Sequence, residues 1–195
     1  MQQSITLIDT ILSGRSNRNL LRDAMIALAA TGLLTLSAKI QVPLIVPMTL
    51  QSLVVLLIGA AFGWRLGAAT LALYLAEGAV GLPVFAGTPE KGLGLGYMAG
   101  PTGGFLVGML FGALLTGILA ERGWTRTVTG ALSVMTVGHV VIFLFGSAWL
   151  AVLFGAEKAY SIGIAPFYAA SLIKILLGAA LLPAAWCLVG RLRKS

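Results

Sequence analysis

Long apolar runs alternate along this chain with short links that are polar or rich in glycine and proline. Six such runs predict helices over residues 20–38, 49–62, 66–80, 105–120, 128–154 and 164–190. A helix that crosses a bilayer needs about 20 predominantly apolar residues. Barrel strands would instead alternate apolar and polar positions. The pattern therefore predicts an all-α integral membrane protein with six transmembrane helices, of which the second and third are short and would extend into their flanks.

Composition supports a membrane protein. Of the 195 residues, 58% are hydrophobic and only 10% are charged, whereas about 25% are charged in a typical soluble domain. So few polar side chains cannot cover a water-facing globule. We expect three regions: a cytoplasmic N-terminal segment (1–19), a six-helix membrane domain (20–190) and a basic cytoplasmic tail (191–195).

The thirteen Lys and Arg residues give the expected orientation. Three of them, Lys39, Lys91 and Lys158, fall in links on one side, and Lys174 falls inside the last apolar run. The other nine lie on the side of both termini: Arg15, Arg18, Arg22, Arg65, Arg122, Arg126, Arg191, Arg193 and Lys194. Because cytoplasmic flanks carry the excess of Lys and Arg, we expect cytoplasmic termini, with links 39–48, 81–104 and 155–163 outside. The net charge of +7 is thus attributed to topology and not to a nucleic-acid partner.

Four polar residues interrupt the apolar runs and need an explanation, because burying a charge in a membrane costs several kcal/mol. Lys174 lies roughly 15 Å below the outer end of its helix, too deep to reach the surface easily, so we expect it to face a polar cavity. Glu77 either lies at the headgroup level, neutralises Lys174 or contacts a ligand. His139, near the middle of its helix, more often makes an internal hydrogen bond. Gln51 lies one turn into the outer end of the second helix.

These positions share the outer half of the predicted bundle, together with neighbours on the same helix faces. An outward-facing cavity with ammonium, amide and hydroxyl groups in an apolar wall would suit a small anionic ligand. The candidate substrate-binding residues are Lys174, Ser171, Gln51, Lys91, Glu77 and Tyr74.

Small residues predict close helix packing at two places. Gly104, Gly108, Gly112 and Thr116 recur every fourth residue, a spacing that lets another helix approach closely. In the first helix a stripe of small residues would serve either internal packing or docking of a partner helix: Ala24, Ala27 and Thr31.

Catalytic chemistry has little support in the sequence. The GxSxG, HExxH and Walker A motifs are absent, and a single histidine with a single cysteine, Cys187, cannot build a standard zinc site. We expect no catalytic residue, metal or cofactor in this chain. The alternative is an intramembrane enzyme that acts on a lipid with His139 and Glu77 as acid and base. A structural subunit without a ligand would leave Lys174 unexplained.

Four segments in order resemble the BioY family, the biotin-binding S components (substrate-binding subunits) of energy-coupling factor (ECF) transporters. They are PMTLQ (47–51), GLPVFAG (81–87), GPTGGF (100–105) and SLIKI (171–175), within a resemblance that spans 24–183. The resemblance implies six helices and an outward-opening biotin pocket. It also implies a transmembrane partner protein and cytoplasmic ATPases that use ATP.

The resemblance also implies roles for individual residues. Lys174 would contact biotin or organise the pocket, Gln51 would lie near the carboxylate, and Lys91 falls where the family has another basic ligand. Ser171 departs from the family, because related chains often carry an aspartate there that accepts from the ureido N–H groups; Glu77 or Tyr74 would then supply those contacts. An S component for another vitamin is the nearest alternative, and the sequence leaves homo-oligomer formation open.

Overall fold

The structure is a computed structural model that describes residues 6–11, 19–42 and 48–192. Arg15, Arg18, Pro47, Arg193 and Lys194, which carry part of the charge asymmetry or of the motifs above, lie outside these ranges. The described elements in chain order are α1 (Leu7–Ile11), α2 (Leu20–Lys39), β1 (Gln41–Val42), β2 (Met48–Thr49), α3 (Gln51–Ala79), α4 (Gly94–Met98), α5 (Gly103–Glu121), the 3-10 turn η1 (Trp124–Arg126), α6 (Val128–Phe154), α7 (Ala156–Gly163), the 3-10 turn η2 (Ala165–Phe167) and α8 (Tyr168–Leu192).

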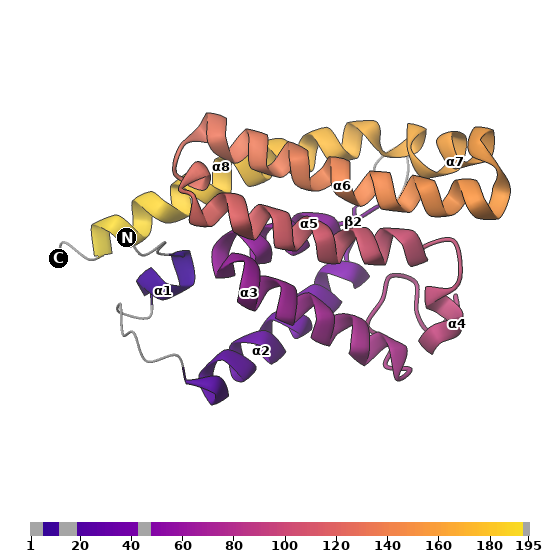
Figure 1. The fold of residues 1–195 in the computed structure, drawn as a ribbon, viewed down its shortest axis with the longest axis horizontal. Coiled ribbons are helices and arrows are strands. Elements are labelled where there is room, and N and C mark those ends of the chain that lie inside the picture. The colour runs from indigo at the N-terminus through magenta and orange to yellow at the C-terminus, as the bar shows by residue number, and fades with distance from the viewer. Residues whose placement is uncertain (1–5, 12–18, 43–47, 193–195) are drawn as a thin grey trace.

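The molecule is an elongated helical bundle (Figure 1). Five described segments are long and apolar enough to cross a membrane: 20–39, 51–79, 103–121, 128–154 and 156–191. The prediction of a mainly helical membrane protein is confirmed. Two details differ from the sequence-based expectation: β1 and β2 form a two-residue antiparallel pair, and the link 155–163 is itself largely helix α7.

The segment α3 reverses direction at Gly63 and so contains two of the predicted helices. Gly63 has φ 80° and ψ 173°, a conformation that glycine adopts without the strain a Cβ would bring. A straight helix would separate Gly59 from Gly67 by about 12 Å, yet a Cβ on Gly67 would lie only 3.0 Å from Cα of Gly59. The two halves, 51–62 and 64–79, therefore lie side by side.

Helix α5 lies between α3 and α6, and its glycines set how closely it packs. A Cβ on Gly108 would lie 2.8 Å from the carbonyl oxygen of Ile142, and a Cβ on Gly112 would lie 3.3 Å from that of Gly138. On the other side of α5, a Cβ on Gly117 would lie 2.5 Å from the backbone nitrogen of Trp64. The small-residue ridge predicted for this helix thus packs inside the chain, against α6.

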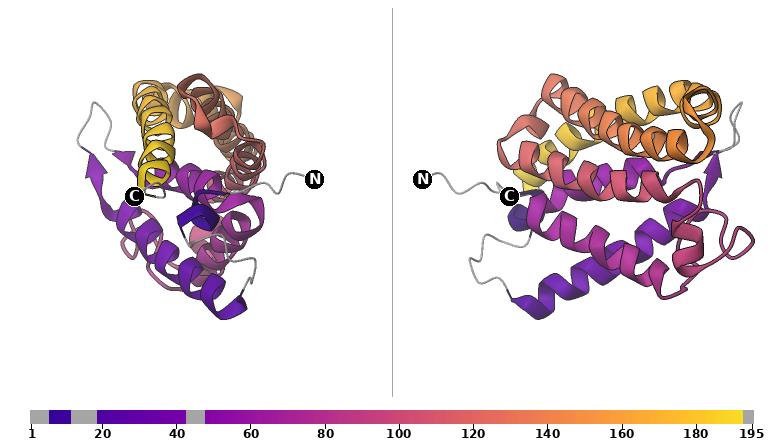
Figure 2. Two further views of the ribbon diagram at one scale, coloured as in Figure 1. Left: turned by 90° about the vertical axis from the view of Figure 1, so that its left-hand side faces the viewer. Right: turned by 45° about the vertical axis from the view of Figure 1, so that its right-hand side comes forward.

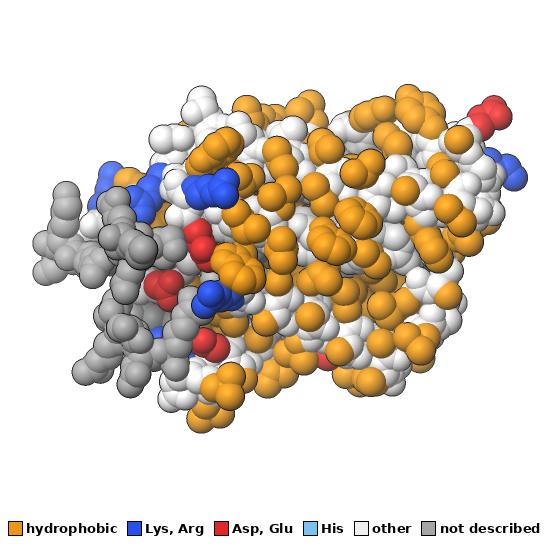
Figure 3. All heavy atoms as spheres, in the orientation of Figure 1, with side chains coloured by type: hydrophobic (Ala, Val, Ile, Leu, Met, Phe, Trp, Pro, Cys, Tyr) orange, Lys and Arg blue, Asp and Glu red, His pale blue; other side chains and the backbone are white. Residues whose placement is uncertain are grey.

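Both ends of the described chain lie at the same end of the bundle (Figure 1). Helix α1 contacts α3 and α8 there, and Trp186 of α8 donates from Nε1 to Oγ1 of Thr125 at 3.1 Å. The face in Figure 3 carries charged side chains mainly at this end and at the opposite tip, with a broad hydrophobic area between. This distribution is what a bilayer-spanning bundle requires.

Helix α2 lies at the edge of the bundle, against α3 (Figure 2). Asn19 caps its start, with Oδ1 accepting from the backbone N–H of Leu21 at 3.1 Å, which satisfies one free donor of the first turn. Much of the surface of α2 is apolar and exposed, including Met25, Leu28 and Leu36.

We predict that Gly108→Leu destabilises the protein, because the new side chain would meet the backbone of Ile142. Overpacking costs about 1–3 kcal/mol, which corresponds to a melting temperature lower by about 2–12 °C. The matched control is Gly32→Leu, since a Cβ on Gly32 of α2 meets nothing within 4 Å. Thermal unfolding in detergent measures both; equal melting temperatures for the two variants would contradict the close α5–α6 contact.

Candidate substrate-binding cavity

A cavity of about 340 Å³ has residues of α4 and α7 in its wall, and these two helices lie at the end of the bundle remote from the termini (Figure 1). Its volume is in the range of small-molecule sites, which are about 300–1,000 Å³. It reaches the surface at Gln41 and Lys91, both of which are exposed. Its wall is mostly apolar and combines residues from the two strands, the loop before α4, and the helices α3 to α8: Gln41, Thr49, Gln51, Ser52, Ala86, Gly87, Lys91, Tyr97, Pro101, Thr102, Phe105, Leu106, Met109, His139, Ile142, Phe143, Leu150, Ile162, Gly163, Phe167, Ser171 and Lys174.

Lys174 places an ammonium group in this wall. The residue is only 8% exposed, and its Nζ donates to the hydroxyl of Ser52 at 3.0 Å. In the described ranges the only ion pair joins Arg22 to Asp23, so no described carboxylate neutralises Lys174. A buried cation without a counterion is costly unless something else stabilises it. The site therefore favours an electron-rich ligand group beside Nζ.

A chain of hydrogen bonds fixes Gln51 in the wall. Its Nε2 donates to the hydroxyl of Tyr74 at 3.0 Å, and that hydroxyl donates to the carbonyl oxygen of Val84 at 2.7 Å. All three residues are buried. The chain links both halves of α3 with the loop that follows, and it leaves Oε1 of Gln51 available to a ligand.

The loop between α3 and α4 is held from two further sides. Lys39, at the end of α2, donates from Nζ to the carbonyl oxygens of Phe85 and Thr88 and to Oγ1 of Thr88. Tyr97 of α4 donates to the carbonyl oxygen of Ala86 at 2.8 Å. Burial raises the pKa of Tyr97, so its hydroxyl remains a donor at neutral pH. The ring of Phe85 lies between those of Tyr74 and Tyr97, at centroid distances of 5.4 and 5.2 Å.

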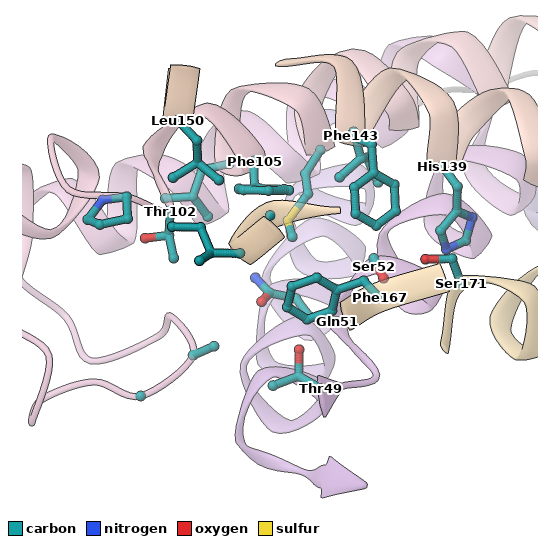
Figure 4. Close-up of a pocket in the computed structure, with 18 of the residues that line it drawn as sticks. Thr49, Gln51, Ser52, Thr102, Phe105, His139, Phe143, Leu150, Phe167 and Ser171 are labelled. Atoms are coloured by element: carbon teal, nitrogen blue, oxygen red, sulfur yellow. The ribbon is translucent and has the colours of Figure 1, made fainter. Parts of the chain in front are cut away.

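His139 also belongs to the cavity wall. It is 2% exposed, and its Nδ1 lies 2.9 Å from the carbonyl oxygen of Met135, one turn earlier in α6. His139 from α6 and Ser171 from α8 point into the same end of the cavity (Figure 4).

The structure brings four of the six predicted binding residues to the cavity: Lys174, Ser171, Gln51 and Lys91. Tyr74 does not line the cavity and acts on it through Gln51. Glu77 does not line it either, because its Oε1 accepts from the hydroxyl of Thr31 at 2.9 Å and so faces α2. The pairing of Glu77 with Lys174, one of the alternatives above, is therefore not formed.

The predicted docking stripe of α2 is divided in the structure. Ala27 and Thr31 are buried at 6% and 3% exposure, whereas Ala24 is exposed. The first two therefore serve internal packing between α2 and α3.

Sequence reasoning did not identify Ser52 as a cavity residue. For His139 it favoured an internal hydrogen bond and kept an acid–base role only in the enzyme alternative. For Ser52 the available signal was its position next to Gln51, but only the packing of α8 against α3 brings it to Lys174. For His139 the signal was its place at the middle of a long apolar helix. The aromatic wall residues Phe105, Phe143 and Phe167 carry no such signal, because aromatic residues line helix contacts throughout a membrane bundle.

A buried lysine in the wall of a mostly apolar cavity, inside a bundle of membrane helices, defines a membrane protein with a candidate small-molecule site. The BioY family model matches residues 5–191, and the chain belongs to this family.

Curated relatives and a solved structure agree with this assignment. The chain is 39% identical over 177 residues to the biotin transporter BioY of Rhizobium etli, covering 85% of this chain and 91% of that one. It is 37% identical over 151 residues to the biotin transporter BioY of Thermotoga maritima, covering 76% and 86%. A crystal structure of the S-component for biotin from an ECF-type ABC transporter matches with a TM-score of 0.72 at 23% identity, covering 92% of this chain and 95% of that one, and shows the same fold. These relatives are transport proteins and not enzymes.

We predict that Tyr74→Phe loosens the loop 81–93 while the bundle stays folded. The change removes the donor to Val84 and the acceptor of Gln51, and one such bond is worth about 1 kcal/mol. Amide hydrogen exchange in this loop should become about five- to tenfold faster. The control is Tyr160→Phe, at an exposed tyrosine of α7. Unchanged loop exchange in Tyr74→Phe would contradict the proposed link.

Proposed function

We propose that this chain is the substrate-binding component of a biotin importer, which captures biotin from the outer face of a bacterial inner membrane. The observation that carries the proposal is the buried ammonium group of Lys174, which no described carboxylate neutralises, in a mostly apolar cavity of small-molecule size. The names of the relatives support biotin as the substrate.

In this proposal the membrane is crossed six times. The two halves of α3 each make one crossing, which together with α2, α5, α6 and α8 gives six, and residues 20–190 form the membrane domain. The excess of Lys and Arg at the end that holds the termini favours a cytoplasmic location for that end, including residues 1–19 and 191–195. The cavity, which lies in the other half, then opens outward.

Four of the residues predicted from the sequence contact biotin in this proposal. Lys174 and Ser171 serve the inner part of the cavity, and Gln51 serves the part nearer the strands. Lys91 pairs with the carboxylate at the exposed opening, where a charged group keeps part of its hydration and loses less free energy. Tyr74 and Glu77 act indirectly, the first by holding Gln51 and the second by holding α2 through Thr31.

Import requires partners that this chain does not supply. The solved relative is described as part of an ECF-type ABC transporter, which supports a transmembrane partner and cytoplasmic ATPases that use ATP. Of the predicted docking stripe, Ala24 is the residue exposed on α2, so docking through α2 would use the side on which Ala24 lies.

We predict that Lys174→Met weakens biotin binding by about thirtyfold or more. Loss of a charged, desolvated hydrogen-bond donor costs about 2 kcal/mol or more, and methionine keeps most of the side-chain volume. The control is Lys158→Met, at an exposed lysine of α7, which should bind as the wild type does. Titration of labelled biotin against the purified protein measures both.

Competition distinguishes biotin from other vitamins in the same titration. Unlabelled biotin should displace the label, and riboflavin and thiamine should not. Equal affinity of the wild type and Lys174→Met would contradict the assigned role of Lys174, whereas displacement by riboflavin or thiamine in place of biotin would contradict the substrate.

ATP-driven import is tested separately, by uptake of labelled biotin into cells that contain this chain with or without the ECF partner subunits. We expect accumulation above the external concentration only with active partner ATPases. The same accumulation without them would contradict ATP-driven import while leaving the binding function intact.

A further inference from the structure

We propose that His139 is a specificity residue of the cavity, whose Nε2 accepts a hydrogen bond from a ureido N–H group of bound biotin. This inference rests on the proposed function. Its motivating observation is that, in the described part of the chain, Nε2 of His139 is the only buried side-chain nitrogen or oxygen without a hydrogen-bond partner. Such an atom in a cavity wall costs free energy until a ligand satisfies it.

The hydrogen bonding of the ring determines what Nε2 can do. The carbonyl oxygen of Met135 can only accept, so Nδ1, which lies 2.9 Å from it, carries the proton. In a neutral imidazole the other nitrogen, Nε2, is then an acceptor. An imidazolium would place a second cation in the cavity that already holds Lys174, again without a described carboxylate to offset it. The cavity therefore presents a neutral acceptor at this point.

The other polar groups of the same cavity end are poorly suited to accept from a ligand N–H. Lys174 has donors only, and the hydroxyl of Ser52 already accepts from Lys174. Ser171 can accept, but its hydroxyl rotates and so offers no fixed direction. His139 is instead held rigidly by its bond to Met135, so Nε2 is the fixed acceptor of this region.

This arrangement selects which end of biotin binds there. A carboxylate has acceptors only, and the lone pair of Nε2 would repel it. A cyclic urea offers N–H donors beside a carbonyl oxygen, which matches an acceptor on His139 and a donor on Lys174 in one cavity. The structure thus assigns the ureido group to the end of the cavity lined by His139, Ser171 and Lys174.

Three variants of His139 distinguish the role of Nδ1 from the role of Nε2. In His139→Asn the amide nitrogen can still donate to Met135, but nothing reaches the position of Nε2; we expect biotin binding about tenfold weaker. In His139→Gln the longer amide can place its oxygen near that position, and affinity should stay within about threefold of the wild type. His139→Leu removes both groups and should bind at least as weakly as the asparagine variant.

A ligand change tests the contact itself. Biotin methylated at one or the other ureido nitrogen is compared with biotin on the wild type and on His139→Asn, with thermal unfolding as the check on folding. Methylation of the ligand and the change His139→Asn each weaken binding. For one of the two methylated ligands, the combined loss of affinity should be about tenfold smaller than the product of the two separate losses, because both changes remove the same hydrogen bond. A purely structural role of His139 would leave the losses additive.

The outcomes are distinct for the two proposals. If the wild type binds biotin and His139→Asn binds it equally well, or if the losses are additive for both methylated ligands, the role of His139 is wrong and the biotin function stands. A glutamine variant as weak as the asparagine variant would also overturn the acceptor role. If the folded wild type does not bind biotin, both proposals fail.

Discussion

The hydrogen-bond chain from Gln51 through Tyr74 to Val84 is the interaction on which the site depends. It joins the start of α3, its returning half and the loop beside the cavity through buried side chains. It can form because α3 reverses at Gly63, which brings together two residues that would lie about 35 Å apart in a straight helix. Buried polar bonds of this kind fix geometry that apolar packing alone leaves less specific.

The buried polar groups give the cavity its chemical character. In a wall of apolar and aromatic side chains, each donor or acceptor that lacks a partner constrains the ligand strongly, because the local dielectric is low. Lys174 offers donors and His139 an acceptor at one end, and Lys91 offers a cation at the opening. In the proposed binding mode a ligand matches all three, so a few residues would select one small molecule from others of similar size.

Much of the fold could be predicted from the sequence, since long apolar runs and glycine spacing are local signals. The predicted helix over 128–154 coincides with α6, and the glycines at 104, 108 and 112 pack as a ridge. Lys174 was found because a charge deep in an apolar helix is unusual wherever it occurs. The reversal of α3 was also foreseeable, as a polar, glycine-containing interruption between two short runs.

The other residues of the site could not be predicted from local signals, because their positions depend on how helices distant in the sequence face one another. Glu77 lies on the side of α3 that faces α2, and Ala27 and Thr31 lie on the side of α2 that faces α3. Helical spacing shows which residues share a face but not which neighbouring helix that face contacts. Ser52 meets Lys174 across 122 positions of sequence. The unsatisfied Nε2 of His139 is visible only when every neighbour is in place.

The most direct test of the account is a structure of the purified protein with biotin bound. We predict density for biotin in the cavity between α3, α5, α6 and α8, with its ureido group within hydrogen-bonding distance of Lys174 and His139 and its carboxylate toward Lys91. Biotin bound outside this cavity, or with its carboxylate against His139, would contradict the account.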